Sequence, residues 1–251
     1  MAKEKQNLNH LAVIPDGNSR WADANGVKAT EGYKKGMNRI IELTKASKKL
    51  NIHTLTIWGL STENWLHRPK LELDFIVNLL MDAIDEFVGD AMKEGVRIYH
   101  LGRKDRLPTK LVEKLAEIAQ KTESNINYVL NLALDYGGVD EIIRATQKIA
   151  QDVKDGKLTV EDIGKIVGNK DAKLKEYVFN SYLDTSGQQN PYVDYVIRTS
   201  GEIRLSGLMP IQAAYSEFYF EPCFFPDFDE AKLKHAYDAY FNRQRRFGGG
   251  H

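Results

Sequence analysis

Short apolar runs alternate with segments of helical periodicity along most of the chain. Runs rich in β-branched and aromatic residues predict strands near 10–14, 53–60, 96–101, 126–134 and 193–198. Apolar residues three or four positions apart predict helices near 33–50, 70–94, 108–122 and 139–155, a polar helical stretch near 159–182 and a last helix near 229–243. This alternation predicts an α/β fold in which helices surround a largely parallel central sheet.

The segment 70–94 carries the clearest apolar stripe. Ile76, Leu80, Ala83, Phe87 and Ala91 follow one another at helical spacing. Such a stripe is wide enough to pack on a sheet or to line a cavity. From periodicity alone, packing in the core is the simpler interpretation.

Charge and cysteine content narrow the class of protein. The 251 residues include 35 Lys and Arg and 35 Asp and Glu, so the global basic excess of a general nucleic-acid binder is missing. Cys223 is the only cysteine, which excludes an internal disulfide and favours a reducing compartment, the cytoplasm. We expect residues 1–9 to form a polar tail without a signal-peptide core and residues 10–251 to form a single domain without a transmembrane run.

Asp16 and Arg20 lie in the first candidate site, IPDGNSRW at 14–21, directly after an apolar strand. Asp-Gly-Asn is a common turn sequence, and a turn alone would explain it. However, a strand that leads into a helix presents backbone N–H groups at the edge of a sheet where α/β proteins bind phosphates. Asp16 is then a candidate ligand for a divalent cation, and Arg20 for a phosphate oxygen.

Three other segments offer groups for anions. In 197–206, Arg198 and Arg204 combine with neighbouring hydroxyl groups, as a diphosphate would require. The segment 61–69 contains Asn64, Trp65 and Arg68 after another strand, and the end at 242–249 has an arginine pair before glycines. Each also has a simpler interpretation, as a solvated loop, a capped turn or a frayed end.

A shared polyanion site explains these segments together better than separate roles do. Three of the four follow strands, and the carboxyl ends of parallel strands meet at one edge of a sheet. The chain has no P-loop, no GxGxxG after a strand, and no HExxH or CxxC pair. A Walker-type nucleotide site, a Rossmann dinucleotide site and a zinc centre are therefore not favoured.

In their order along the chain, these segments resemble the cis-prenyltransferase family, which includes the undecaprenyl diphosphate synthases. The resemblance runs through HLAVIPDGNSRWA, LTIWGLSTENW, HLGRKDRLP, LNLALDYGG, VDYVIRTSGE, IRLSG, YSEFYF, FFPDFDE and RRFGG. It implies a parallel sheet whose helices enclose a hydrophobic tunnel, a homodimer, and Mg²⁺-dependent condensation of isopentenyl diphosphate with an allylic diphosphate. A long apolar product also implies peripheral membrane contact.

The resemblance further implies a role for each matching residue. Asp16 and Asn64 would be catalytic, and Mg²⁺ would be held by Asp16 and Glu217. The implied substrate-binding residues are Gly17, Asn18, Ser19, Arg20, Trp21, Trp65, Arg68, Arg198, Arg204, Ser206 and, across a dimer, Arg246 and Gly248.

Several positions depart from the family pattern. Ser19 replaces the usual glycine, Ala29 and Tyr33 replace an arginine and a histidine, and one extra residue precedes Arg68. The segment with Tyr33, together with Ile203 and Pro210, resembles the lavandulyl diphosphate synthases, which join two five-carbon units head-to-middle. We rank regular elongation first because the Asp-Gly-Asn and Glu-Asn-Trp segments are intact. A non-catalytic partner subunit and a cyclase-like activity are disfavoured because Asp16 and the 198–206 segment are retained.

Overall fold

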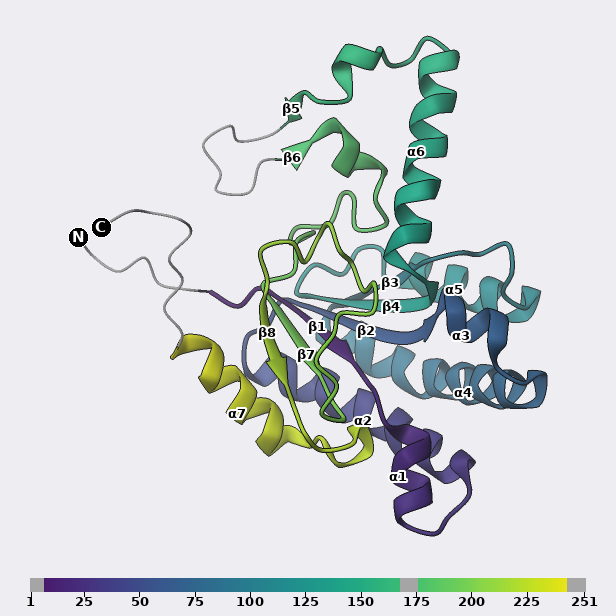
Figure 1. Ribbon diagram of the computed structural model, residues 1–251, viewed down its shortest axis with the longest axis vertical. Coiled ribbons are helices and arrows are strands. Elements are labelled where there is room, and N and C mark those ends of the chain that lie inside the picture. The colour runs from purple at the N-terminus through teal and green to yellow at the C-terminus, as the bar shows by residue number, and fades with distance from the viewer. Residues whose placement is uncertain (1–6, 168–175, 243–251) are drawn as a thin grey trace.

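A six-stranded parallel sheet forms the centre of the part of the chain that the computed structural model describes, residues 7–167 and 176–242 (Figure 1). Its strands are β1 (His10–Ile14), β2 (Thr54–Ser61), β3 (Val96–Leu101), β4 (Tyr128–Tyr136), β7 (Tyr195–Arg198) and β8 (Glu217–Phe220). They lie in the order β3-β4-β2-β1-β7-β8. The helices are α1 (Asn18–Ala24), α2 (Ala29–Lys49), α3 (Thr62–His67), α4 (Lys70–Glu94), α5 (Thr109–Lys121), α6 (Gly138–Lys154) and α7 (Glu230–Phe241).

The predicted α/β class is confirmed, and so is the parallel sheet with its helices. The helix expected over 70–94 has those bounds as α4, and each expected strand is present within two residues at either end. The short helices α1 and α3 and the strand β8 were not among the elements expected from periodicity. Each is only four to seven residues long, too short to show a repeat.

The helical stretch expected over 159–182 is wrong. Its described residues form 3₁₀ turns at Val160–Asp162 and Val178–Tyr182 and a small antiparallel sheet of β5 (Ile166–Val167) and β6 (Glu176–Tyr177). Thr159 caps the first turn, and its side chain and that of Asp162 bond to each other's backbone amides. This stretch lacks a continuous apolar stripe, so no face packs it against the sheet as a helix.

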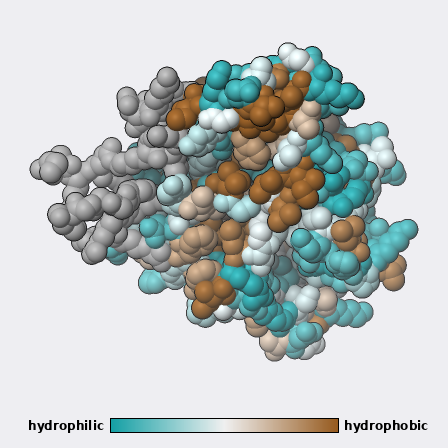
Figure 2. Space-filling view, turned by 45° about the horizontal axis from the view of Figure 1, so that its top comes forward, coloured by the Kyte–Doolittle hydropathy of each residue, from teal (hydrophilic) through white to brown (hydrophobic). Residues whose placement is uncertain are grey.

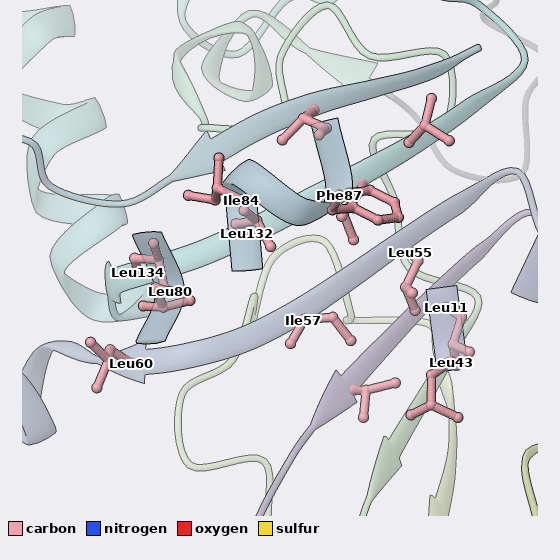
Figure 3. Packing of buried hydrophobic residues seen from close by; sticks show 14 of the residues in the cluster. Leu11, Leu43, Leu55, Ile57, Leu60, Leu80, Ile84, Phe87, Leu132 and Leu134 are labelled. Atoms are coloured by element: carbon pink, nitrogen blue, oxygen red, sulfur yellow. The ribbon is translucent and has the colours of Figure 1, made fainter. Parts of the chain in front are cut away.

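Alternating side chains of the central strands are buried in two separate hydrophobic cores, one on each face of the sheet. Leu11 and Val13 of β1 belong to a core with α2, α4, α5 and α7, whereas Ala12 and Ile14 belong to a second core on the other face. Figure 3 shows side chains of α4 facing those of β2 and β4 in the first core: Leu80, Ile84 and Phe87 opposite Ile57, Leu132 and Leu134. Burial on both faces explains why these strands read as continuous apolar runs.

A buried polar network joins β1 to its neighbours on the sheet. His10 is fully buried, with Nδ1 bonded to the carbonyl oxygen of Asn190 at 2.9 Å and Nε2 to Thr56 Oγ1 at 2.8 Å. Thr56 Oγ1 also accepts from Asn131 Nδ2, and the amide groups of Asn131 and Gln188 bond to each other. These contacts fit a neutral imidazole with its proton on Nδ1.

The burial of His10 predicts a loss of stability in mild acid. Desolvation lowers the pKa of His10 from 6.5 to about 4, so the unfolded chain binds a proton more readily than the folded one. The contribution is complete above pH 6.5 and is lost as the pH falls toward 4, by about 3 kcal/mol in all. Urea unfolding between pH 7 and 4.5 should show a shallower pH dependence for His10→Gln than for the wild type. Equal pH dependence would exclude His10 as the group responsible.

Within residues 7–167 and 176–242, no helix combines the length and apolar content needed to cross a membrane.

Candidate active site

A pocket of about 590 Å³ opens at the carboxyl ends of β1, β2 and β7. From β1, the chain continues to β2 on one side of it, whereas β7 and β8 lie on its other side. The direction in which strands are added to the sheet therefore reverses between β1 and β7. Ligands of open α/β sheets bind at such a point. Its walls come from these strands and from α1 to α4: Ile14, Pro15, Asp16, Gly17, Asn18, Ser19, Arg20, Tyr33, Gly36, Met37, Ile40, Trp58, Gly59, Ser61, Glu63, Asn64, Arg68, Ile76, Leu79, Leu80, Arg198, Ser206 and Phe225.

Asp16 lies between two arginines at the end of β1. Its Oδ2 accepts from Arg198 Nη2 at 2.9 Å, and its Oδ1 accepts from Arg20 Nη2 at 3.0 Å. Its backbone is fixed by Thr199, whose Oγ1 accepts from Asp16 N at 3.0 Å and donates to Asp16 O at 2.7 Å. β1 and β7 therefore hold a carboxylate between two guanidinium groups at the mouth of the pocket.

Arg198 is the most deeply buried cation of the site, with its side chain 6% exposed. Its Nη1 donates to the carbonyl oxygen of Arg204 at 2.6 Å and to Ser206 Oγ at 2.7 Å. Ser206 has a φ of 52°, a strained backbone for a residue with a Cβ, in the loop that brings its hydroxyl to Arg198. Among the described residues, Arg198 Nε has no hydrogen-bond partner, which leaves a buried donor unsatisfied.

Gly17 permits the sharp entry from β1 into α1. Its φ is +99°, and a Cβ there would lie 2.7 Å from a ring carbon of Phe224. Glycine is the residue that adopts this conformation without a steric penalty. Asp-Gly-Asn thus forms the turn that its composition predicts, at Gly17, and it also leads into a helix, α1, which begins at Asn18.

Glu202 links the two exposed arginines of the site. Its carboxylate accepts from Arg20 Nη1 at 2.9 Å and forms an ion pair with Arg204. These hydrogen bonds hold the pKa of Glu202 below its ordinary value. Arg20, Arg198 and Arg204 are thus paired with only two carboxylates, those of Asp16 and Glu202, and this group has a net positive charge.

A second hydrogen-bonded group lies on the α2 and α4 side of the pocket. Tyr33 OH contacts Ser19 Oγ at 2.8 Å, accepts from Arg68 Nη1 at 2.8 Å and donates to Glu72 Oε1 at 2.6 Å. Arg68 Nη1 also donates to Glu72 Oε1 at 2.9 Å. Ser19, Tyr33 and Arg68, three positions at which the chain departs from the family pattern, therefore meet at the hydroxyl group of Tyr33.

Asn64 faces the pocket from α3. The N-cap residue Ser61 accepts a hydrogen bond from Asn64 N at 3.0 Å, which orders the first turn of this short helix. Trp65, the next residue, packs against the first core and does not line the pocket.

The polar pocket continues inward as an apolar cavity of about 50 Å³ between α2, α4, α5 and the sheet. The two share Met37, Ile40, Gly59 and Leu80 as lining residues. Farther in, the cavity is bounded by Ile84, Phe87, Ile98, Ile118, Leu130, Leu132 and Leu134, among others. The stripe of α4 that periodicity identified therefore serves both packing and the lining of this cavity.

Most of the residues expected in the site line the pocket. These are Asp16, Gly17, Asn18, Ser19, Arg20, Asn64, Arg68, Arg198 and Ser206. Arg204 and Trp21 do not line the pocket. Arg204 is joined to Arg20 of the pocket wall through Glu202, and Trp21 Nε1 donates to Asp227 at 3.0 Å. Arg246 and Gly248 lie outside the described residues.

Glu217 is not brought to the pocket within this chain. It begins β8 and pairs with Tyr195, the first residue of β7, whereas Asp16 follows the other end of β1. Within the described ranges, no cluster of three or more His, Cys, Asp or Glu residues is arranged to hold a metal. Glu63 lines the pocket and belongs to the Glu-Asn-Trp motif, but the sequence analysis did not single it out. Glu72 lies in none of the motifs, although it follows Arg68 by four positions, a spacing typical of ion pairs on helices.

Comparisons with known proteins agree on one family. A family model described as putative undecaprenyl diphosphate synthase matches residues 14–248. An isoprenyl transferase of Streptococcus pneumoniae is 42% identical over 96% of this chain and 91% of its own length, and one of Bacillus thuringiensis is 39% identical over 96% and 88%.

Two solved structures share the fold. A lavandulyl diphosphate synthase from Lavandula x intermedia, solved in complex with dimethylallyl diphosphate, superposes with a TM-score of 0.88 at 34% identity and covers 96% of this chain and 98% of its own. A probable undecaprenyl diphosphate synthase from Campylobacter jejuni superposes with a TM-score of 0.73 at 31% identity, covering 97% and 100%.

Proposed function

The chain belongs to the undecaprenyl diphosphate synthase family of prenyltransferases, and we propose on that basis that it condenses isopentenyl diphosphate with an allylic diphosphate by regular cis elongation. The observation that carries this proposal is the pairing of two environments. A pocket with Arg20, Arg68 and Arg198 on its walls leads directly into a cavity lined by apolar side chains. A diphosphate attached to a hydrocarbon chain has the same two parts in the same order.

Arg198 and its neighbours are the groups best suited to isopentenyl diphosphate. A phosphate oxygen would satisfy the buried Nε of Arg198, and Ser206 and Arg204 lie on the same loop. Asp16, Asn18 and Arg20 at the start of α1 would face the allylic diphosphate. Gly17, Ser19 and Trp21 belong to the same turn and helix, and the proposal includes them among the substrate-binding residues.

Magnesium fits the donor groups of the site when a substrate is present. Mg²⁺ in proteins commonly takes one or two carboxylates and completes its shell with water and substrate phosphates. Asp16 supplies such a carboxylate at the mouth of the pocket. Bound there, Mg²⁺ would neutralise the charge that develops on the leaving diphosphate. Within one chain, Glu217 lies at the opposite end of the sheet from Asp16. Glu217 would therefore bind this Mg²⁺ only in an assembly of more than one chain.

The reaction requires that the C–O bond of the allylic diphosphate break while a C–C bond forms to isopentenyl diphosphate, followed by loss of a proton. Arg20, Arg68 and Arg198 would hold the two diphosphates close together and stabilise the negative charge of the leaving group. Asn64 on α3 would orient the reacting groups, with Trp65 supporting that helix from the core. The apolar cavity would receive the growing chain and keep water from the carbocation.

The same proposal includes a homodimer in the cytoplasm with peripheral membrane contact. Apolar side chains of α6 and of the segment after it are exposed, among them Val139 at 68% and Ile143 at 50%. Figure 2, in which the top of the molecule comes forward, shows apolar patches between polar ones on this face. Exposed apolar patches of this kind are typical of interaction surfaces.

Head-to-middle coupling of two dimethylallyl diphosphate molecules is the second candidate. The superposition with the lavandulyl diphosphate synthase and the direct contact of Ser19 with Tyr33 favour it. Mass spectrometry of the products separates the two candidates. The purified protein is incubated with Mg²⁺ and either dimethylallyl diphosphate alone, or isopentenyl diphosphate plus geranyl or farnesyl diphosphate. Elongated products from the second mixture support our proposal, whereas a branched ten-carbon diphosphate from the first would contradict it.

Arg204→Ala should raise the KM for isopentenyl diphosphate about tenfold and change kcat less, because it removes one charged hydrogen-bond donor from the substrate. The backbone carbonyl of residue 204 still accepts from Arg198, so the buried part of the site is retained. Steady-state kinetics with varied isopentenyl diphosphate measure the effect, and Arg97→Ala on the edge strand β3 is a matched control. An unchanged KM would place this diphosphate elsewhere.

A further inference from the structure

Arg68 is held in place by side chains from two other elements. It is the first residue after α3 and has an extended backbone, as a residue before proline usually does. Its Nη1 is bonded to Tyr33 OH of α2 and to Glu72 Oε1 of α4. The guanidinium carbon also lies 5.6 Å from the centre of the Tyr33 ring.

The direction of each hydrogen bond at Tyr33 can be assigned. Arg68 is a donor only, and an ionised Glu72 is an acceptor only, so the phenol oxygen accepts from Arg68 and its proton goes to Glu72. Ser19 Oγ must then be the donor in its contact with Tyr33. Burial and the bond to Glu72 raise the pKa of Tyr33, so the hydroxyl stays protonated at neutral pH.

This arrangement leaves part of the guanidinium group available. Among the described residues, no hydrogen bond involves Arg68 Nη2 or Nε, and Arg68 lines the same pocket as Asp16. A free arginine in solvent samples many rotamers, and ordering it on a ligand costs free energy. Contacts made before the ligand arrives reduce that cost.

We infer that Tyr33 and Glu72 are positioning residues that orient Arg68 so that its free N–H groups receive the diphosphate of the allylic substrate. The inference deepens the proposed function and rests on it for the identity of that substrate. It also gives the departure at position 33 a structural role. Tyr33 stands where the family pattern has a histidine, and its hydroxyl together with Glu72 fixes the orientation of Arg68.

Equilibrium binding of inorganic pyrophosphate in the presence of Mg²⁺, measured by calorimetry on the full chain, tests the inference without turnover. Tyr33→Phe should weaken binding about tenfold, the worth of one hydrogen bond to a charged group. Glu72→Ala should weaken it similarly, whereas Glu72→Gln retains an acceptor oxygen and should bind within about threefold of the wild type. If Glu72 only repelled the anion, Glu72→Ala would instead bind pyrophosphate more tightly than the wild type.

A double-mutant cycle distinguishes positioning from a general structural effect. In an Arg68→Ala background, Tyr33→Phe should cause no further loss, because the group that it positions is gone. Tyr182→Phe is the matched control, since it removes a hydroxyl bonded to Asp152 at 2.8 Å far from the pocket. Its affinity for pyrophosphate should equal that of the wild type.

The outcomes separate this inference from the proposed function. Additive losses from Tyr33→Phe and Arg68→Ala, or no pyrophosphate binding by the wild type, would overturn the inference. A wild type that makes no elongated product but binds pyrophosphate in the Tyr33-dependent manner would overturn the proposed function alone. With an active enzyme, Tyr33→Phe should raise the KM for farnesyl diphosphate about tenfold and leave that for isopentenyl diphosphate unchanged.

Discussion

Replacing Asp16 with Asn should lower kcat about a thousandfold while the protein remains folded. The substitution preserves the size of the side chain but removes its charge. One of the two groups bonded to Arg20 and Arg198 becomes an amide that faces a guanidinium N–H, donor against donor. The carboxylate proposed to bind Mg²⁺ is lost by the same change.

Steady-state kinetics with both diphosphates present measure this effect. Asp23→Asn on the exposed side of α1 is the matched control, because it makes the same chemical change seven residues along the chain and away from the pocket. Thermal unfolding by circular dichroism should give similar midpoints for both variants and the wild type. A wild-type kcat for Asp16→Asn would remove Asp16 from the reaction.

The Phe87→Ala substitution should yield longer products than the wild type. Phe87 is 7% exposed on α4 and borders the apolar cavity that follows the pocket. Removal of its ring enlarges this space, and each added five-carbon unit needs more apolar wall to replace water. We expect the main product to lengthen by at least one such unit.

Mass spectrometry of products formed with excess isopentenyl diphosphate tests this expectation. Truncation of a buried phenylalanine costs about 3 to 5 kcal/mol of stability, so the variant must be shown to be folded. Phe228→Ala is the matched control, because Phe228 is fully buried in the same core but borders neither the pocket nor the cavity. Phe87 does not limit product length if Phe228→Ala lengthens the product as well. The same conclusion follows if folded Phe87→Ala, or the milder Phe87→Leu, gives products of wild-type length.

The sequence predicts the central sheet well because its signal is strong and local. Strands buried on both faces give unbroken apolar runs, and the buried stripe of α4 extends from Leu73 to Ala91, about five turns. The segment 159–182 was mispredicted because its structure depends on capping and short-range turns, which periodicity does not report. The strand β8 is only four residues long and is half-buried, so its pattern is too short to stand out.

Pocket residues that follow strand ends could be singled out from the sequence, whereas those brought together by contacts between separate elements could not. Asp16, Arg198 and Ser206 follow or end strands, and they meet because neighbouring strands are parallel. Tyr33 was visible only as a substitution, since nothing in the sequence shows that its hydroxyl reaches Arg68 and Glu72 across two helices. Glu217 was expected at the same site, but it lies at the amino end of β8. Its motif did not show this, because β8 was not predicted as a strand.

The pairing of β1 with β7 also sets the time at which the protein can become active during its synthesis. Asp16 and Arg198 contact each other although 182 positions separate them. A ribosome must therefore release most of the chain before β1 can acquire its second neighbour, and until then one edge of β1 is exposed. Contacts of such long range are also associated with slow folding. Nascent chains that end before β7 should consequently depend on chaperones and should not bind diphosphates, whereas chains that extend beyond β8 can complete the sheet.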